Sequence, residues 1–426
     1  MVHTMLSYIK HSPDCFHAVR SLENMLQNEG YIRLEEGGWN LEKGGKYYTV
    51  RNGSSLIAFR IPENEPVGLM MTAAHSDSPC FRIRDCAELT GTYTRLSCER
   101  YGGMLNATWL DRPLSVAGRV LVRTDKGVES RLVDLEKDAV LIPNVAIHLN
   151  REANNGLKLD PARDLQPLYG GKDAAGSFRK QIAEAAGCNE TDILATDLFV
   201  YNNQSGAVWG ADGEFVSAPR LDDLACVFAC AQGFLMAKDT DTIPVLGVFD
   251  NEEIGSETKQ GAASMFLPDT LRAIREALGL TEAQGRTMLS SGMLLSCDNG
   301  HGLHPNHPEL SDANEAPVLG GGVVIKHSPR YATDGMSSAV FSEICRKAGV
   351  PVQHYSNRPD QTGGSTLGNI ANTKTGISTV DVGMAQLAMH SSFETAACAD
   401  VDYFIRAVEA FYGTALKTEQ DAVIIE

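Results

Sequence analysis

The feature of this sequence that most restricts its fold is a set of short apolar runs that each stop at an acidic residue or a histidine. One run spans 67–74 and is followed by His75, and another spans 243–249 and leads to the pair Glu252-Glu253. Apolar runs of this length are typical of buried strands. In an open α/β sheet, binding residues gather just beyond the carboxyl ends of the strands. We therefore expect an α/β sheet with these side chains along one edge.

Residues of the same chemical kind border further apolar segments, and they are Asp77, Asp222, Asp223, Asp298 and His390. The two adjacent aspartates precede the run 224–235, which predicts a buried helix. Taken singly, each candidate is more simply explained as an acidic loop or a structural histidine. Together, five segments converging on one edge would supply two histidines and three or four carboxylates.

The adjacent Glu252 and Glu253 can take different roles only at a turn. A turn presents one carboxylate to a metal ion and leaves the other beside it as a base, the division that metal-assisted hydrolysis requires. Imidazole and carboxylate without thiolate suit zinc, and also manganese or cobalt. No HExxH motif is present, so the fold would have to assemble the site. The spacing of His75 and Asp77 would let the aspartate hold the second imidazole nitrogen.

The pattern of secondary structure that the sequence predicts changes twice along the chain. Residues 4–30 have helical periodicity, and short strands follow up to residue 74. From about 87 the sequence is rich in short β-type runs, and strand–helix alternation returns after Asp222. We expect a discontinuous α/β/α sandwich with a central mixed sheet, formed by residues 1–86 and 216–426. A β-rich domain, residues 87–215, would interrupt it.

Charge and composition exclude several classes of partner. The net charge of −17 argues against nucleic acid and anionic membranes, and no apolar run approaches the roughly 20 residues of a membrane span. Residues 1–10 contain no apolar signal segment, and the ten cysteines show no paired spacing. We therefore expect a cytoplasmic protein with reduced cysteines, Cys226 and Cys230 lying in a core.

Seven segments together resemble those of the M18 metalloaminopeptidases, the aspartyl aminopeptidase family; in chain order they are HSDSP, PRLDD, DNEEIGS, SCDNGHGLHPN, RYATDG, GGSTLG and DVGMAQLAMHS. The resemblance extends from about residue 5 to 415. It implies an enzyme that removes N-terminal residues from peptides with a free N-terminus. It also implies two divalent metal ions in each chain, zinc before manganese or cobalt.

The resemblance assigns roles to the candidate residues. The implied metal ligands are His75, Asp222, Glu253, Asp298 and His390. Asp222 would bridge the two ions, although the neighbouring Asp223 is an alternative. Glu252 would act as the general base, and Asp77 would orient His75.

Related enzymes prefer an N-terminal Asp or Glu, which requires a cation and hydrogen-bond donors in the substrate pocket. Lys326, at the end of the strand-like run 322–325, and Tyr331 match family positions with this role. His301 follows the expected ligand Asp298 closely, and with His304 and His307 it could line the pocket or hold its loop. From the residues alone, Lys326 is more simply explained as a solvated lysine at a strand end.

The segment Ile142-Pro143-Asn144-Val145-Ala146-Ile147-His148-Leu149-Asn150 stands out within the expected insert. From its residues alone it predicts a strand with a partly buried histidine. The resemblance instead implies a dimerisation domain in which His148 reaches the active site of the neighbouring subunit. Dimers of this kind would assemble into a homo-oligomer, a tetrahedral dodecamer.

Two other functions stay open. A carboxypeptidase or amide deacylase could use the same dinuclear core, and a non-catalytic assembly protein could retain the family shell. The intact Glu252 and the complete set of expected ligands weigh against the second of these.

Overall fold

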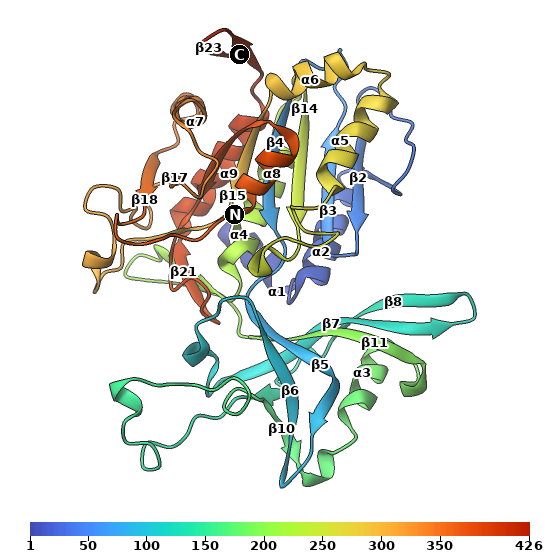
Figure 1. The fold of residues 1–426 in the computed structure, drawn as a ribbon, viewed down its shortest axis with the longest axis vertical. Coiled ribbons are helices and arrows are strands. Elements are labelled where there is room, and N and C mark those ends of the chain that lie inside the picture. Colours follow the sequence, from blue (N-terminus) through green and yellow to red (C-terminus); the bar gives the residue numbers. More distant parts are fainter.

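A computed structural model describes all 426 residues of the chain, which form two bodies (Figure 1). The upper body combines the beginning of the chain, drawn in blue, with the second half, drawn in yellow to red. The lower body consists of the segment between them, drawn in light blue to green. The expected architecture, a discontinuous α/β domain interrupted by a β-rich insert, is confirmed.

A nine-stranded mixed sheet lies at the centre of the upper body. Its four inner strands, β14, β4, β15 and β19, run parallel to one another, whereas β3 and β17 pair antiparallel on either side of them. The parallel strands therefore end at the same edge. In spatial order the strands are β1 (Ile32–Leu34), β2 (Lys46–Arg51), β3 (Ser55–Arg60), β14 (Thr242–Phe249), β4 (Gly68–His75), β15 (Met293–Cys297), β19 (Ser378–Gly383), β17 (Val323–His327) and β18 (Val352–Ser356).

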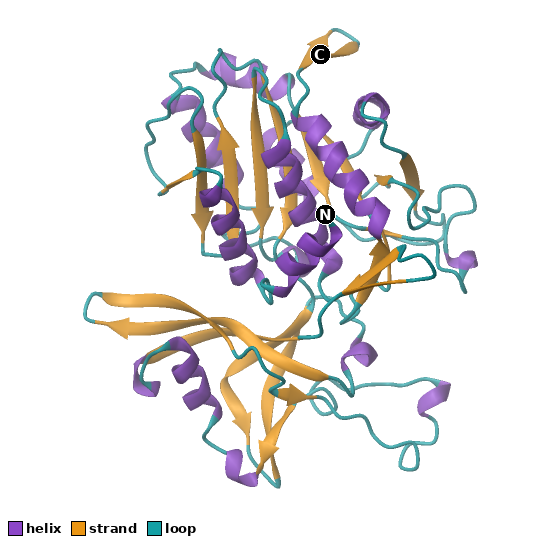
Figure 2. Cartoon of the chain, turned by 180° about the vertical axis from the view of Figure 1, so that it is seen from behind, coloured by secondary structure: helices purple, strands orange, loops and turns teal.

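Helices cover both faces of this sheet, so the inner strands are buried on both sides (Figure 2). In β4, Met70 belongs to one hydrophobic core with residues of α1, α2, α4, α7 and α9, whereas Leu69 and Met71 belong to another with residues of α5, α6 and α8. The helices of the first layer are α1 (Val2–Lys10), α2 (Cys15–Asn28), α4 (Leu221–Met236), α7 (Gly335–Lys347) and α9 (Cys398–Tyr412), and those of the second are α5 (Phe266–Ala277), α6 (Glu282–Ser290) and α8 (Leu367–Thr375).

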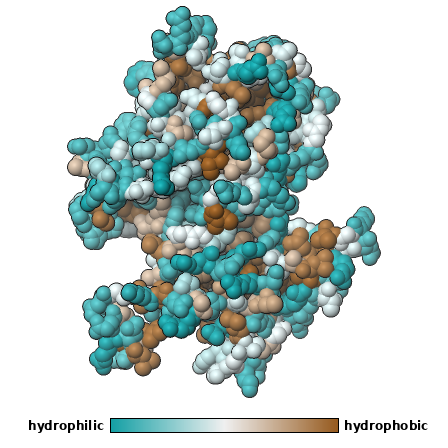
Figure 3. All heavy atoms as spheres, viewed as in Figure 1, coloured by the Kyte–Doolittle hydropathy of each residue, from teal (hydrophilic) through white to brown (hydrophobic).

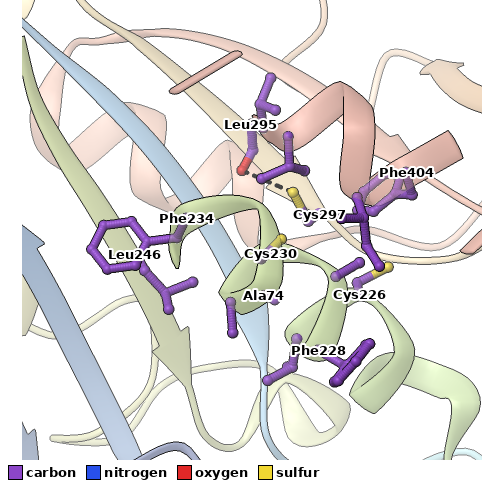
Figure 4. Close-up of a cluster of buried hydrophobic side chains, with 14 of the residues drawn as sticks. Ala74, Cys226, Phe228, Cys230, Phe234, Leu246, Leu295, Cys297 and Phe404 are labelled. Atoms are coloured by element: carbon purple, nitrogen blue, oxygen red, sulfur yellow. Dashed lines mark hydrogen bonds between the residues drawn. The ribbon is translucent and has the colours of Figure 1, made fainter. Parts of the chain in front are cut away.

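Helix α4 is apolar on nearly every side because it lies between the sheet and α9. Cys226, Phe228 and Cys230 of α4 are all buried, and Cys297 at the end of β15 lies in the same core (Figure 4). These cysteines, like the others in the chain, are free thiols.

The insert has an antiparallel sheet and a core of its own. Because β7 pairs with β11 as well as with β8 and β9, the sheet closes on itself, and α3 (Phe178–Ala186) packs against it. In spatial order its strands are β11 (Ile193–Tyr201), β5 (Cys80–Leu89), β6 (Tyr93–Tyr101), β10 (Leu168–Gly171), β9 (Val140–Leu141), β7 (Pro113–Thr124) and β8 (Gly127–Asp134). The sheet begins at Cys80, ahead of the expected position 87.

A small five-stranded sheet flanks the edge where the inner strands end. It carries the residues around the loop from Ala388 to Phe393 and the approach to α4. Its strands are β12 (Ala207–Trp209), β13 (Phe215–Ala218), β21 (Glu394–Ala397), β20 (Ala385–Leu387) and β16 (Gly300–His301).

The remaining regular elements are short. A hairpin of β22 (Leu416–Glu419) and β23 (Ala422–Ile425) closes the chain. The 3-10 turns are η1 (Asn106–Trp109), η2 (Ala153–Asn155), η3 (Lys172–Ala174), η4 (Glu190–Asp192), η5 (Glu252–Ile254) and η6 (Pro308–Leu310). None of the helices combines the length and the apolar character that a membrane crossing requires.

Candidate metal centre

The ends of the inner strands and the start of α4 bring the expected ligands together. Three overlapping groups have ligand-type atoms within 4.8 Å of one another; they are His75 with Asp222, Asp223 and Asp298, His75 with Glu252 and Glu253, and Asp222 with Glu253 and His390. Every expected ligand is thus a member of at least one group.

Asp222 lies at the middle of the cluster. Its Oδ1 atom is 3.5 Å from Nε2 of His75, and its Oδ2 atom is 3.4 Å from Nε2 of His390. Nε2 of His75 is also 4.0 Å from Oδ1 of Asp298, and Nε2 of His390 is 3.5 Å from Oε1 of Glu253. The two oxygens of the Asp222 carboxylate therefore face two separate sets of candidate ligands.

The residues fit divalent cations. Oδ1 of Asp222, Oδ1 of Asp223 and Oε1 of Glu253 are buried without any hydrogen-bond donor. A buried carboxylate oxygen without a partner is costly, and a cation removes that cost. Burial raises the pKa of Glu253 well above its usual value, and nearby Asp222 adds to this. Nitrogen and oxygen donors of this kind suit zinc.

The backbone around Asp222 is held by a buried glutamate. Asp222 has non-helical backbone angles although it lies at the start of α4. Its N–H donates to Oε2 of Glu394 over 3.0 Å, and the N–H of His390 donates to Oε1 of the same side chain over 2.7 Å. Burial and the charge of Asp222 raise the pKa of Glu394 to about 8. Glu394 thus fixes Asp222 and His390, two candidate ligands that are distant in sequence.

Asp77 organises the turn that carries the two glutamates. The N–H groups of Glu252 and Glu253 donate to its two carboxylate oxygens over 3.1 and 3.2 Å. Asn251, in the left-handed region with φ of 63°, starts the turn. Burial, together with the charges of nearby carboxylates, raises the pKa of Glu252 to about 7, a value suited to a general base near neutral pH.

His75 is fixed in one orientation. Its Nδ1 atom lies 3.0 Å from the backbone carbonyl oxygen of Asp77 and 3.5 Å from the Asp77 carboxylate, so the carbonyl is the nearer acceptor. Donation from Nδ1 leaves Nε2 free to face the cluster. Asp223 accepts the backbone N–H of His75 over 3.1 Å.

Lys326 lies beside the cluster, with only 1% of its surface exposed. Its ammonium donates to the backbone oxygen and the carboxylate of Asp298, over 2.8 and 3.1 Å, and to the backbone oxygen of Asn299 over 3.3 Å. Each of its three N–H bonds therefore has an acceptor. Tyr331 is half-buried, with its ring centre 5.4 Å from this ammonium. His301 is exposed, and its ring meets Tyr355 edge-on.

His148 belongs to none of these groups. The prediction from its residues of a strand with a partly buried histidine is wrong, because β9 ends at Leu141, residues 143–149 are exposed, and the chain forms a turn at 147–149. Pro143 lacks the N–H that a strand ladder needs, and the Asn144 side chain accepts the N–H of Val145.

Sequence reasoning missed several residues that hold the cluster in place. Tyr101 donates its hydroxyl to Asp77 over 2.7 Å, and the carbonyl of Gly103 lies 2.7 Å from Nδ1 of His390. Both residues belong to the insert, and nothing in their local sequence indicates this contact. Glu394 does carry a signal, because an acidic residue four positions after a candidate ligand can fold back on a tight turn.

Known proteins are similar in sequence to this chain along almost its full length. Residues 8–412 match the family described as "Aminopeptidase I zinc metalloprotease (M18)". The "Probable M18 family aminopeptidase 2" of Clostridium acetobutylicum is 40% identical over 421 residues, which cover 96% of this chain and 97% of the relative. The protein of the same name from Pseudomonas fluorescens strain Pf0-1 is 40% identical over 422 residues, with the same coverage.

Solved structures agree with the sequence relationship. Ape4, seen by cryo-electron microscopy in complex with Nbr1, superposes with a TM-score of 0.93 at 30% identity, covering 96% of this chain and 85% of its own. The mApe1 dodecamer of S. cerevisiae gives 0.84 at 27% identity, covering 96% and 95%. The chain belongs to the M18 family of metalloaminopeptidases. It is an aminopeptidase, a metal-dependent exopeptidase of the hydrolase class.

Proposed function

We propose that this aminopeptidase uses two divalent metal ions per chain to remove N-terminal residues from peptides. The observation that carries the proposal is the position of Asp222, whose two oxygens face His75 and His390 separately. One ion would be held by His75, Asp222 and Asp298, and the other by His390, Asp222 and Glu253. Asp223 would steady the backbone at His75. Zinc fits this donor set best, with manganese or cobalt as alternatives.

Bound ions would supply positive charge that polarises the scissile carbonyl and makes water more acidic. The chain itself provides the proton transfer. Glu252 accepts a proton from the attacking water at its carboxylate and returns it to the leaving amine as the C–N bond breaks. Asp77 keeps this carboxylate in place through the backbone of the turn.

We also propose a preference for N-terminal Asp or Glu. Lys326, Tyr331 and His301 would form the pocket, and the Lys326 charge would attract the substrate carboxylate. Since Asp298 and Asn299 accept the Lys326 N–H bonds, the attraction would act through its electric field. Hydrogen bonds to the substrate would come from Tyr331 and His301.

The insert is proposed to dimerise. Residues 87–215 are proposed as this domain and residues 1–86 and 216–426 as the catalytic domain, with the first boundary moved to Cys80, where β5 of the insert begins. Val145, Ile147 and Leu149 are 52%, 47% and 83% exposed, and apolar side chains are visible on this extended loop (Figure 3). Exposed apolar clusters are typical of interfaces. His148 would then reach the active site of the neighbouring subunit and donate to the developing oxyanion. A dodecamer, as in mApe1 of S. cerevisiae, is the proposed assembly.

The central experiment joins metal content to cleavage. Metal-free protein is reconstituted with zinc, manganese or cobalt, the bound ions are counted, and peptides beginning with Asp, Glu, Leu or Lys are offered with free and with acetylated N-termini. We expect two ions per chain and cleavage of free N-termini only, fastest for Asp and Glu. Binding below one ion under every metal would overturn the dinuclear centre. Cleavage from the carboxyl end of acetylated peptides would instead favour a carboxypeptidase.

A further inference from the structure

The end of strand β6 and the segment after it lie against the candidate metal centre of their own chain. We call residues 101–108 the strut segment. The Tyr101 hydroxyl donates to Oδ2 of Asp77 over 2.7 Å and accepts the side-chain N–H of Asn251 over 2.8 Å. Asp77 in turn accepts the N–H groups of the two glutamates. One hydroxyl of the insert is thereby fixed between the residues that begin and support the Glu252–Glu253 turn.

The strut segment also holds His390. The Gly103 carbonyl accepts from Nδ1 of His390 over 2.7 Å, which leaves Nε2 to face Asp222 and Glu253. The N–H of Leu105 donates to the carbonyl oxygen of His390 over 2.9 Å. Partners of this kind set the tautomer and the orientation of a metal-binding histidine.

Two further contacts secure this loop. Thr108 accepts the N–H of Ser392 at its hydroxyl over 3.0 Å, and its carbonyl accepts the Ser392 hydroxyl over 2.6 Å. A methyl group added at Gly102, where φ is +80°, would lie 3.1 Å from Cβ of Glu253. The strut segment therefore fits closely against one of the two ligand sets.

The strut segment supports the two proposed sets of ligands unequally. His390 and Glu253 are reached directly or through Asp77, whereas Asp298 is held by Lys326 of the catalytic domain. His75 donates from Nδ1 to the backbone carbonyl oxygen of Asp77, and this contact does not involve the Tyr101 hydroxyl of the insert.

We infer that the insert builds part of the metal centre of its own chain, with Tyr101 and Gly103 as positioning residues for the Glu252–Glu253 turn and for His390. The inference rests on the proposed dinuclear function. It predicts that the ion between His390 and Glu253 depends on the insert, while the ion between His75 and Asp298 does not. Movement of the insert would thus change one metal affinity selectively.

The test is Tyr101→Phe, which keeps the ring and its edge-on contact with Phe199 and removes only the hydroxyl. Metal-free protein is titrated with zinc against a competing chelator, so that two affinities are resolved. We expect one affinity to fall about 10-fold and the other to stay unchanged, since loss of such a supporting partner costs about 10- to 100-fold. The kcat should fall by a similar factor without a matching rise in KM.

Tyr169→Phe is the matched control, because it removes a hydroxyl that bonds only to Ser177 inside the insert. This variant should keep both affinities. Equal loss of both affinities in Tyr101→Phe, or no loss in either, would overturn the inference while leaving the proposed function intact. If the unaltered enzyme itself binds fewer than two ions, the proposed function fails instead.

Thr108→Val gives an independent measurement if Tyr101→Phe folds poorly. It removes the acceptor for the N–H of Ser392 but leaves the Thr108 carbonyl in place. We expect the same affinity to weaken, by a smaller factor than in Tyr101→Phe. A weakening confined to the other affinity would contradict the assignment of the strut segment to His390.

Discussion

Two stretches of the insert behave in opposite ways. The strut segment places its polar atoms against Asp77, Asn251 and His390, and these contacts are made within one chain. Residues 143–149 instead expose Val145, Ile147 and Leu149, and the side chain of His148 has no hydrogen bond. Polar groups that are hydrogen-bonded within the chain belong to a contact that needs no partner molecule. Exposed apolar groups, in contrast, are typical of a surface that another molecule covers. One small domain thus faces two active sites, its own and, as proposed, that of a neighbour.

The largest expected effect concerns the active site that the strut segment supports within its own chain. Glu252→Gln keeps the shape of the side chain and removes the proton acceptor, so kcat should fall by about 10²- to 10⁴-fold. Metal content and assembly should persist, because Glu253 and His390 remain. Glu257→Gln, an exposed change in the next turn of the same loop, is the control. Near-normal turnover in Glu252→Gln would remove Glu252 from the role of base.

The next effect tests whether the exposed stretch works across subunits. His148→Ala should lower kcat by about 10²- to 10³-fold if the imidazole donates to the oxyanion. Mixing these subunits with Glu252→Gln subunits under exchange should restore some activity, since one site of a mixed dimer has both residues intact. His3→Ala, at an exposed histidine of α1 that lies outside the candidate site, should change little. Verified exchange without recovery would place His148 in its own chain or in a structural role.

Leu149→Asp tests the apolar surface itself. Leu149 is 83% exposed, and a charge there should split the oligomer by opposing desolvation of the interface, with loss of the activity that depends on it. Sedimentation velocity measures the assembly. Met236→Asp, at an exposed residue on the end of α4, provides a comparison. An unchanged oligomer would show that the stretch 143–149 is not the interface.

The smallest effect is a pH dependence that belongs to the own-chain side alone. Folding raises the pKa of Glu252 to about 7 and that of Glu394 to about 8, from 4.5. Groups with raised pKa values stabilise the fold below the unfolded value and lose this contribution as pH rises. Metal-free protein should therefore lose stability between pH 4.5 and 8. The difference in Tm between zinc-loaded and metal-free protein should widen over this range, and a constant difference would contradict the assignment.

Much of the candidate metal centre could be predicted from the sequence because strand ends are local signals. His75 and Asp298 directly follow apolar runs, and parallel pairing of β4 and β15 then brings them together. The turn at Glu252 was predictable for the same reason. The sequence also indicated that a β-rich insert interrupts the catalytic domain, although the sheet of the insert begins at Cys80 and not at the expected position 87.

The supporting contacts could not be predicted because they depend on tertiary packing. Tyr101 reaches Asp77 only when the insert has docked, and no periodicity reports that. Lys326 looks like an ordinary lysine at a strand end, yet Asp298 accepts two of its hydrogen bonds. In residues 142–150 the apolar character favours a strand, but Pro143 has no N–H for a strand ladder, and the chain turns at 147–149, where the N–H of Leu149 donates to the carbonyl oxygen of Ala146.

Because the catalytic sheet is built from two separate parts of the chain, the order of synthesis affects when the sheet can form. β4 and β14 are neighbours in the sheet, but the whole insert is synthesised between them. Contacts between residues so far apart in sequence carry a loop-closure cost and form slowly, whereas the insert can fold from its own contiguous segment. With ligands spread from His75 to His390, a chain still on the ribosome cannot close the centre. If His390 holds a metal ion as proposed, peptide cleavage requires that the segment carrying His390 has been synthesised and folded.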